Sequence, residues 1–362
     1  MSTLPQPSVI RLCGTPFEIG RAHGQQLGTE IRAFLARDLA DINAARSEPL
    51  SREQALAMAL RYGAPVASHL PAIADEIRGL AEGADIDPAE AMLLQYRREL
   101  ISDQHENGEC SLFASHAPGQ AGVLAQNIDL PQAMAPLCRL FHIDGSATGH
   151  PDILMTGFAG LCGYMGMNSA GLAIGINFVL SRGWQPGISP YLLVRHLLTL
   201  ESVDAALQAL AQLPRSSSRC LTLLDRQQLA TVEMSTQQLS VVKTAAPGQA
   251  HHAYHTNHYL HADMSALDHM NIFSRNASRL RLNKMQELMQ ALPAPLDAEG
   301  IFSVFSDHSL YPVGICAHAE EHMLRDETVA SVVMQPELGK LFLRRGHPCR
   351  AVTESFRMAD FN

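Results

Sequence analysis

Several features of common protein classes are missing from this 362-residue sequence. It has no dense run of lysine or arginine, and acidic residues outnumber basic ones by 36 to 27. This balance argues against nucleic acid as a main partner, because phosphate binding requires a basic surface. No window approaches the roughly 20 apolar residues of a membrane-spanning helix. The first residues lack the basic stretch and apolar core of a secretory signal, so we expect a cytoplasmic protein without a membrane partner.

Cysteine usage shows no recognisable framework either. The seven cysteines are scattered, odd in number and without a CxxC pair. This pattern favours neither a set of disulfides nor a zinc or redox motif. We expect reduced thiols, most of them acting as small buried hydrophobic residues, and neither a metal nor another cofactor.

The pattern of the chain changes at Cys110. Apolar residues recur at helical spacing from about Phe17 to Leu100, and Asp87-Pro88 is a typical helix start. Short strand-like runs separated by glycine and proline begin at Cys110. The later pattern predicts helices at about 189–213 and 276–292, and strands at 220–225, 229–234, 239–243, 330–335 and 340–345. This order predicts layers of helices and sheets.

Cys110 begins the first strand-like run, directly after Asn107-Gly108 and Glu109. A thiolate attacks carbonyl carbon well once a base takes its proton. If the chain is cut before Cys110, the new α-amino group, with a reference pKa of roughly 7.7–8.0, can be that base. The thiol can drive the cut itself by attacking the carbonyl carbon of Glu109, forming a thioester that water opens. The alternative is an ordinary buried strand cysteine.

Polar motifs follow Cys110 in a distinctive order: Gln126-Asn127-Ile128-Asp129, Gly166-Met167-Asn168-Ser169 and His255-Thr256-Asn257-His258. With Gly14-Thr15-Pro16-Phe17 near the start and Gly346-His347-Pro348-Cys349 near the end, the sequence resembles the acyl-coenzyme A:6-aminopenicillanic-acid acyltransferase-like (isopenicillin-N acyltransferase-like) family. This family of N-terminal-nucleophile hydrolases is related to the choloylglycine hydrolases. The resemblance implies an α+β fold, a four-layer α-β-β-α sandwich. It also implies self-cleavage into a helical segment, 1–109, and a catalytic segment, 110–362.

The resemblance implies roles for individual residues. Cys110 would be the nucleophile, and Asp129 the carboxylate that holds its α-amino group. Asn257 would donate its side-chain amide to the oxyanion, where one donor is worth roughly 3–4 kcal/mol. Asn168 would help to form that hole or orient the amine. Turn formation is the alternative for Asp129 and for Asn168.

Three further residues are candidates for substrate binding. Arg279 lies at a helix start comparable to one in the family and would clamp a substrate carboxylate, with a solvated helix face as the alternative. Thr328 and Ser331 would line the pocket. The sequence departs from the family at Glu109, where glycine is usual, and glycine tolerates the bent peptide of self-attack better.

The expected function is hydrolysis of a small linear N-acyl amide through an acyl-enzyme on Cys110. Acyl transfer to an amine, with acyl-coenzyme A as a donor, is the alternative; no glycine-rich phosphate loop is evident. A second alternative is a non-catalytic protein, or a metal-dependent protein that uses the histidines of 251–261 as ligands. The spacing of these histidines would place them on one face only if the segment were a helix. We also expect the two self-cleaved chains to stay together as a heterodimer, with higher homo-oligomers left open.

Overall fold

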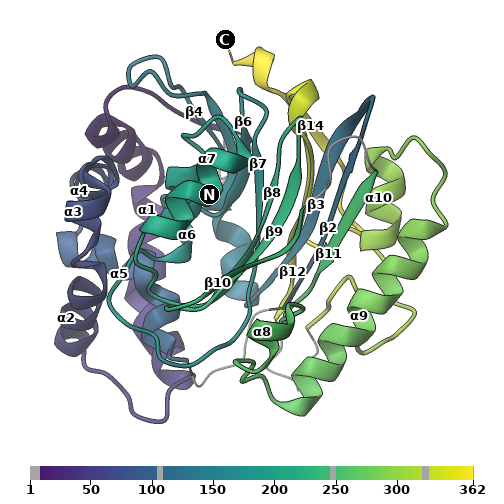
Figure 1. The fold of residues 1–362 in the computed structure, drawn as a ribbon. Coiled ribbons are helices and arrows are strands. Elements are labelled where there is room, and N and C mark those ends of the chain that lie inside the picture. Colours follow the sequence, from purple (N-terminus) through teal and green to yellow (C-terminus); the bar gives the residue numbers. More distant parts are fainter. Residues whose placement is uncertain (1–8, 104–108, 245–249, 320–325, 362) are drawn as a thin grey trace.

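A computed structural model describes residues 9–103, 109–244, 250–319 and 326–361, and shows two β-sheets packed face to face between two layers of helices (Figure 1). The predicted four-layer α-β-β-α sandwich is therefore confirmed. Asn107 and Gly108 lie outside the described residues. Among the described helices, none is long and apolar enough to cross a membrane.

The larger sheet has eight strands, whose order across the sheet is β1 (Val9–Leu12), β4 (Cys138–Ile143), β5 (Ile153–Phe158), β6 (Met165–Asn168), β7 (Ala173–Asn177), β8 (Arg219–Leu224), β9 (Leu229–Met234) and β10 (Leu239–Thr244). Its strands from β4 to β9 are buried along their whole length, because helices cover one face and the second sheet the other. Burial on both faces explains why these segments are mostly apolar and do not alternate regularly between apolar and polar residues.

The smaller sheet has six strands, whose order across the sheet is β11 (His251–His255), β2 (Glu109–Ala117), β3 (Gln120–Leu130), β12 (Glu327–Gln335), β13 (Lys340–Arg345) and β14 (Glu354–Arg357). Neighbouring strands in this sheet are antiparallel. Cys110 is the second residue of β2, so the predicted start of the strand region is correct. The start of β2 is also where the candidate active site is assembled.

Helices of the first outer layer are α1 (Pro16–Ala44), α2 (Arg52–Gly63), α3 (Val66–His69), α4 (Pro71–Ala84), α5 (Pro88–Ile101), α6 (Pro190–Leu197) and α7 (Val203–Gln212). The other side of the sandwich carries α8 (Ala262–Ser265), α9 (Ile272–Gln290) and α10 (Ala298–Phe305), and short 3-10 turns cover Gln132–Leu137, Pro336–Leu338 and Met358–Asp360. Asp87 caps α5 as predicted, in a reciprocal capping box with Glu90.

Helices α1 and α4 approach each other through glycines. A Cβ atom on Gly20 would lie 1.8 Å from the carbonyl oxygen of Glu76, and one on Gly79 would lie 2.0 Å from that of Phe17. Larger residues at these positions would force the helices apart. The glycine at Gly20, part of the opening motif, is therefore explained by helix packing.

The segment before Cys110 is built into the sandwich. Its first strand, β1, pairs in parallel with β4. On α5, the side chain of Gln95 donates to the carbonyl of Gly160 at 2.7 Å and accepts from the amide of Cys162 at 3.0 Å. The Tyr96 hydroxyl donates to the carbonyl of Gly187 at 2.7 Å. Buried hydrogen bonds of this kind join the predicted small segment to the rest of the chain.

Candidate active site

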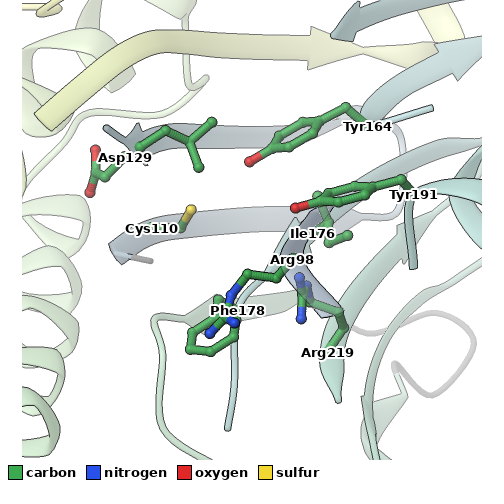
Figure 2. Close-up of a pocket in the computed structure, with 9 residues that line it drawn as sticks. Arg98, Cys110, Asp129, Tyr164, Ile176, Phe178, Tyr191 and Arg219 are labelled. Atoms are coloured by element: carbon green, nitrogen blue, oxygen red, sulfur yellow. The ribbon is translucent and has the colours of Figure 1, made fainter. Parts of the chain in front are cut away.

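The strand pairing between β2 and β3 brings Cys110 and Asp129 together. Cys110 lies opposite Ile128, and Glu109 lies opposite Asp129, so the carboxylate is next to the peptide bond that precedes Cys110. Cys110 is 4% exposed, and Asp129 is buried. Both line a pocket between the two sheets, together with Arg98, Leu130, Tyr164, Ile176, Phe178, Tyr191 and Arg219 (Figure 2).

Asn257, in the turn after β11, contacts the backbone of Cys110 directly. Its Oδ1 atom accepts a hydrogen bond from the backbone amide of Cys110 at 3.0 Å, and its Nδ2 atom donates to the carbonyl of Phe178 at 3.1 Å. The Ser278 hydroxyl accepts from the Asn257 backbone amide at 2.8 Å and holds the turn. An asparagine amide carries two hydrogens, and Phe178 engages one of them.

Arg281 on α9 is the arginine of this region that reaches the site. It is 1% exposed. Its Nη1 atom donates to the carbonyl of Cys110 at 3.0 Å and to the Ser111 hydroxyl at 3.1 Å, and its Nη2 atom donates to Asn257 Oδ1 at 2.8 Å. Because two donors converge on Oδ1, the orientation of the Asn257 amide is fixed.

The prediction for Arg279 needs correction. Arg279 is exposed on α9 and is not among the residues that line the pocket at Cys110. Ser278 and Arg281 are the buried polar residues of this helix, three positions apart and therefore on one face. The motif lies on a helix that contacts Cys110, but the arginine on the buried face of that helix is Arg281, which the motif does not reveal.

Thr328 holds the carboxylate of Asp129 in place by a hydrogen bond. Its hydroxyl donates to Asp129 Oδ1 at 2.6 Å and accepts from the backbone amide of Ala317 at 2.9 Å. Thr328 thus orients the carboxylate and is not among the residues that line the pocket. Ser331 is buried opposite Asn127 in the sheet and is also absent from the pocket lining.

Asn168 has a structural role, which corrects the prediction that it takes part in the reaction. Its Nδ2 atom donates to the carbonyls of Leu198 and Leu200 at 2.9 and 2.7 Å. Its Oδ1 atom accepts from the backbone amides of Ala170 and Leu172, both at 3.1 Å. Backbone groups therefore occupy the whole amide, and the turn alternative describes this residue.

The Cys110 thiol is held in its neutral form in this uncut chain. Burial, and then the negative charge of Asp129, raise the pKa of Cys110 to about 12, while the nearby charge of Arg281 acts in the opposite direction. Burial also raises the pKa of Tyr164 well above its ordinary value, so this phenol stays protonated. Figure 2 shows the hydroxyl ends of Tyr164 and Tyr191 directed toward Cys110.

Two buried arginines form the other side of the pocket (Figure 2). Arg98 and Arg219 stack on Phe178, with guanidinium carbons 4.4 and 5.0 Å from the ring centre. Burial and the charge of Arg219 lower the pKa of Arg98 to about 9. Within the described part of the chain, no carboxylate lies at ion-pair distance from Arg219. Neither residue was predicted from the sequence, because they come from α5 and β8, far from any motif.

The histidines of 251–261 do not form a metal centre. His255 is fully buried and pairs with Glu233, with 2.9 Å between Nε2 and Oε1. His258 contacts the Ser278 hydroxyl at 2.7 Å, and the ring of His252 stacks on Phe113. Among the described residues of this stretch, no three side chains gather as ligands, which corrects the metal-dependent alternative.

Known proteins similar to this chain identify its family. The model of the family "acyl-coenzyme A:6-aminopenicillanic acid acyl-transferase" matches residues 116–349. The 40 kDa form of the acyl-coenzyme A:6-aminopenicillanic-acid-acyltransferase of Emericella nidulans is 26% identical over 344 residues, covering 92% of this chain and 91% of that protein.

Solved structures similar to this chain include a penicillin V acylase from Agrobacterium tumefaciens, 17% identical with a TM-score of 0.46, covering 69% of this chain and 86% of the other. A conjugated bile acid hydrolase from Clostridium perfringens is 13% identical with a TM-score of 0.46, covering 70% and 93%. The family match spans more than half of the sequence. The chain therefore belongs to the acyl-coenzyme A:6-aminopenicillanic acid acyl-transferase family.

Proposed function

We propose that this protein cleaves amide bonds with Cys110 as its nucleophile. The observation that carries the proposal is that Cys110 and Asp129 line one pocket and that Asn257, from a separate part of the sequence, accepts a hydrogen bond from the backbone amide of Cys110. In the proposed reaction the thiol attacks the acyl carbonyl, and the amine leaves with the proton that the base took from sulfur. Water then opens the thioester, releasing the acid and restoring the thiol.

We propose further that the chain cuts itself between Glu109 and Cys110. The backbone nitrogen of Cys110 already donates to Asn257 Oδ1, and after the cut this nitrogen would be the α-amino base beside Asp129. The products would be residues 1–109 and 110–362. The parallel pairing of β1 and the buried bonds of α5 support a heterodimer that separates only in denaturant. Intact mass tests the cut: a fully active, uncut 39.4 kDa chain would contradict it.

Replacing Asn257 with alanine is expected to lower kcat by about 100-fold, because the amide hydrogen that Phe178 does not engage is proposed to stabilise the oxyanion. Steady-state kinetics on a panel of N-acyl amines measures the effect. Asn276→Ala, an exposed position on α9, is the control and should retain normal kinetics. Equal activity of Asn257→Ala and the wild type would remove Asn257 from the mechanism.

The two arginines that line the pocket, Arg98 and Arg219, support the proposal that the substrate carries a carboxylate. Losing a charged hydrogen bond costs about 1.5–3 kcal/mol, so Arg219→Leu should raise KM roughly 10- to 100-fold for such a substrate. Its neutral methyl ester should be affected much less. Arg182→Leu, the same substitution at an exposed position outside the pocket lining, is the matched control. Equal losses for the acid and the ester would assign Arg219 a structural role only.

Acyl transfer remains the second candidate, because the relative from Emericella nidulans is named an acyltransferase. Both reactions share the acyl-enzyme and differ in the acceptor. Adding primary amines to the hydrolysis assay and measuring acid and amide products by mass spectrometry separates them. Formation of amide at the expense of acid would favour transfer, and acid alone would favour hydrolysis.

A further inference from the structure

A second cluster of chemically reactive side chains lies outside the pocket. His308, Cys316, His318 and Cys349 direct one ligand atom each to a common point, and these four atoms lie within 4.8 Å of one another. The first three residues come from the segment between α10 and β12, and Cys349 follows β13. Sequence spacing did not reveal this set, because its two cysteines are 33 residues apart and contribute to no CxxC motif.

The separations within the cluster match a tetrahedral site. Zinc binds sulfur at about 2.3 Å and imidazole nitrogen at about 2.0–2.1 Å, so tetrahedral edges are about 3.8 Å for two sulfurs and about 3.6 Å for sulfur and nitrogen. The two sulfurs are 3.9 Å apart, and each lies 3.5 Å from Nε2 of His318. The Nε2 atoms of His308 and His318 are 2.8 Å apart, somewhat less than a tetrahedral edge.

We propose that these four residues bind one zinc ion. Two thiolates and two imidazoles are a typical zinc donor set, and four protein ligands leave no open position, so the site is structural and not catalytic. The sulfur separation of 3.9 Å excludes a disulfide in this conformation, because the bond length is about 2.0 Å. The ring of His347 stacks on that of His318, with centroids 4.0 Å apart, and helps to orient it.

The position of the cluster gives the ion a function. Cys316 directly precedes Ala317, whose backbone amide donates to Thr328, and Thr328 in turn holds Asp129. The carbonyl of Ile315 accepts from the Asn127 side chain at 2.9 Å. Zinc would therefore tie the segment before β12 to the end of β13 and fix the backbone that orients Asp129. The site stabilises the catalytic carboxylate without contacting substrate.

The test is metal analysis of the full chain, purified without chelators and without a metal-affinity step. Elemental mass spectrometry should find about one zinc ion per chain, and Cys316→Ser and His318→Asn should each reduce this below about a tenth. Cys13→Ser and His150→Asn, both at exposed positions away from the cluster, are matched controls and should retain zinc. Cys110→Ala should retain it as well, so that failure of the catalytic proposal leaves this result unchanged.

Two measurements on the wild type remain informative if the variants do not fold. Cobalt exchanged into the site should give the visible absorption of a tetrahedral ion with a thiolate-to-cobalt charge-transfer band. Titration with an organomercurial should release zinc as Cys316 and Cys349 react, and the melting temperature should fall by several degrees. A wild-type chain that holds no zinc and gives no tetrahedral cobalt spectrum would overturn the proposal. A Cys316–Cys349 disulfide, or zinc retained in Cys316→Ser, would do the same.

Discussion

Cys110→Ala should leave an uncut 39.4 kDa chain without measurable turnover. Removal of a catalytic nucleophile costs about 10⁶-fold in kcat in a well-characterised hydrolase, so we expect a loss of at least ~10⁴-fold here. The physical reason is that both proposed reactions begin at the same sulfur atom. In self-cleavage the sulfur attacks the carbonyl carbon of Glu109, and in turnover it attacks the acyl carbonyl carbon of the substrate.

Two assays check this prediction. Intact mass reports the cut, and turnover of N-acyl amides reports the second reaction. Cys138→Ala is the matched control, because Cys138 is also buried but lies in β4, outside the pocket lining. This control should be cut and active, with a modest loss of stability from the small cavity. Cleavage before position 110 in Cys110→Ala would show that another group performs the cut.

The high thiol pKa in the uncut chain adds a pH dependence to the same experiment. With a pKa of about 12, almost all Cys110 is protonated at neutral pH. The thiolate fraction then rises about tenfold for each pH unit below that pKa. Self-cleavage that depends on the thiolate should therefore accelerate with increasing pH. Rates of product formation that are flat between neutral and alkaline pH would indicate that a local base, not free ionisation, removes the proton.

Much of the fold follows from the sequence because most elements are long or continuously apolar. Strands such as β8 and β12 and helices such as α5 are strongly patterned and were predicted within a few residues. The elements that escaped prediction are short or lie at sheet edges. Strand β1 has four residues, and β11 was read only as a histidine-rich stretch. In β11 alternate burial comes from pairing with β2, which local sequence does not encode.

The residues of the candidate site also fall into those that could be predicted from the sequence and those that could not. Cys110, Asp129 and Asn257 could be predicted as site residues because each lies in a motif, and the motifs follow one another in a recognisable order. The side chains that orient them were missed, as Arg281 was, or were expected in another role, as Thr328 was, since these roles depend on tertiary contacts. In the sequence, Arg281 is one of several charged residues on a polar helix. Its role is evident only from the packing of α9 against β2, which buries Arg281 and brings its guanidinium to the carbonyl of Cys110. Asn168 shows the reverse: its motif suggested chemistry, but backbone groups take its entire hydrogen-bonding capacity.

Arg281→Met is expected to cause the second-largest loss, about 10³-fold in kcat, together with slower self-cleavage. The hydrogen bonds of the guanidinium include those to Cys110 O, Ser111 Oγ and Asn257 Oδ1. Bonds to a charged donor contribute about 1.5–3 kcal/mol each, and a 10³-fold loss corresponds to about 4 kcal/mol. Without Arg281, Oδ1 keeps the Cys110 nitrogen as a donor and Nδ2 keeps the carbonyl of Phe178, so the Asn257 amide is held less firmly in its productive orientation.

A lysine at the same position separates charge from geometry. Arg281→Lys keeps the positive charge but cannot reproduce the planar fork that reaches all three acceptors. Because the charge of Arg281 lowers the pKa of Cys110, its removal raises that pKa, and self-cleavage in Arg281→Met should require higher pH than in Arg281→Lys. Melting temperatures of both variants report the stability cost of each change.

Arg279→Met supplies the control from the same helix. Arg279 is exposed two positions away, so its loss should leave cleavage, kcat and KM close to those of the wild type. If Arg281 served only to stabilise the fold, both Arg281 variants would lower the melting temperature and leave the pH dependence of cleavage unchanged. A shift in that pH dependence in Arg281→Met alone would show that the guanidinium acts on the thiol, because a purely structural contact has no means of changing the pH at which the nucleophile ionises.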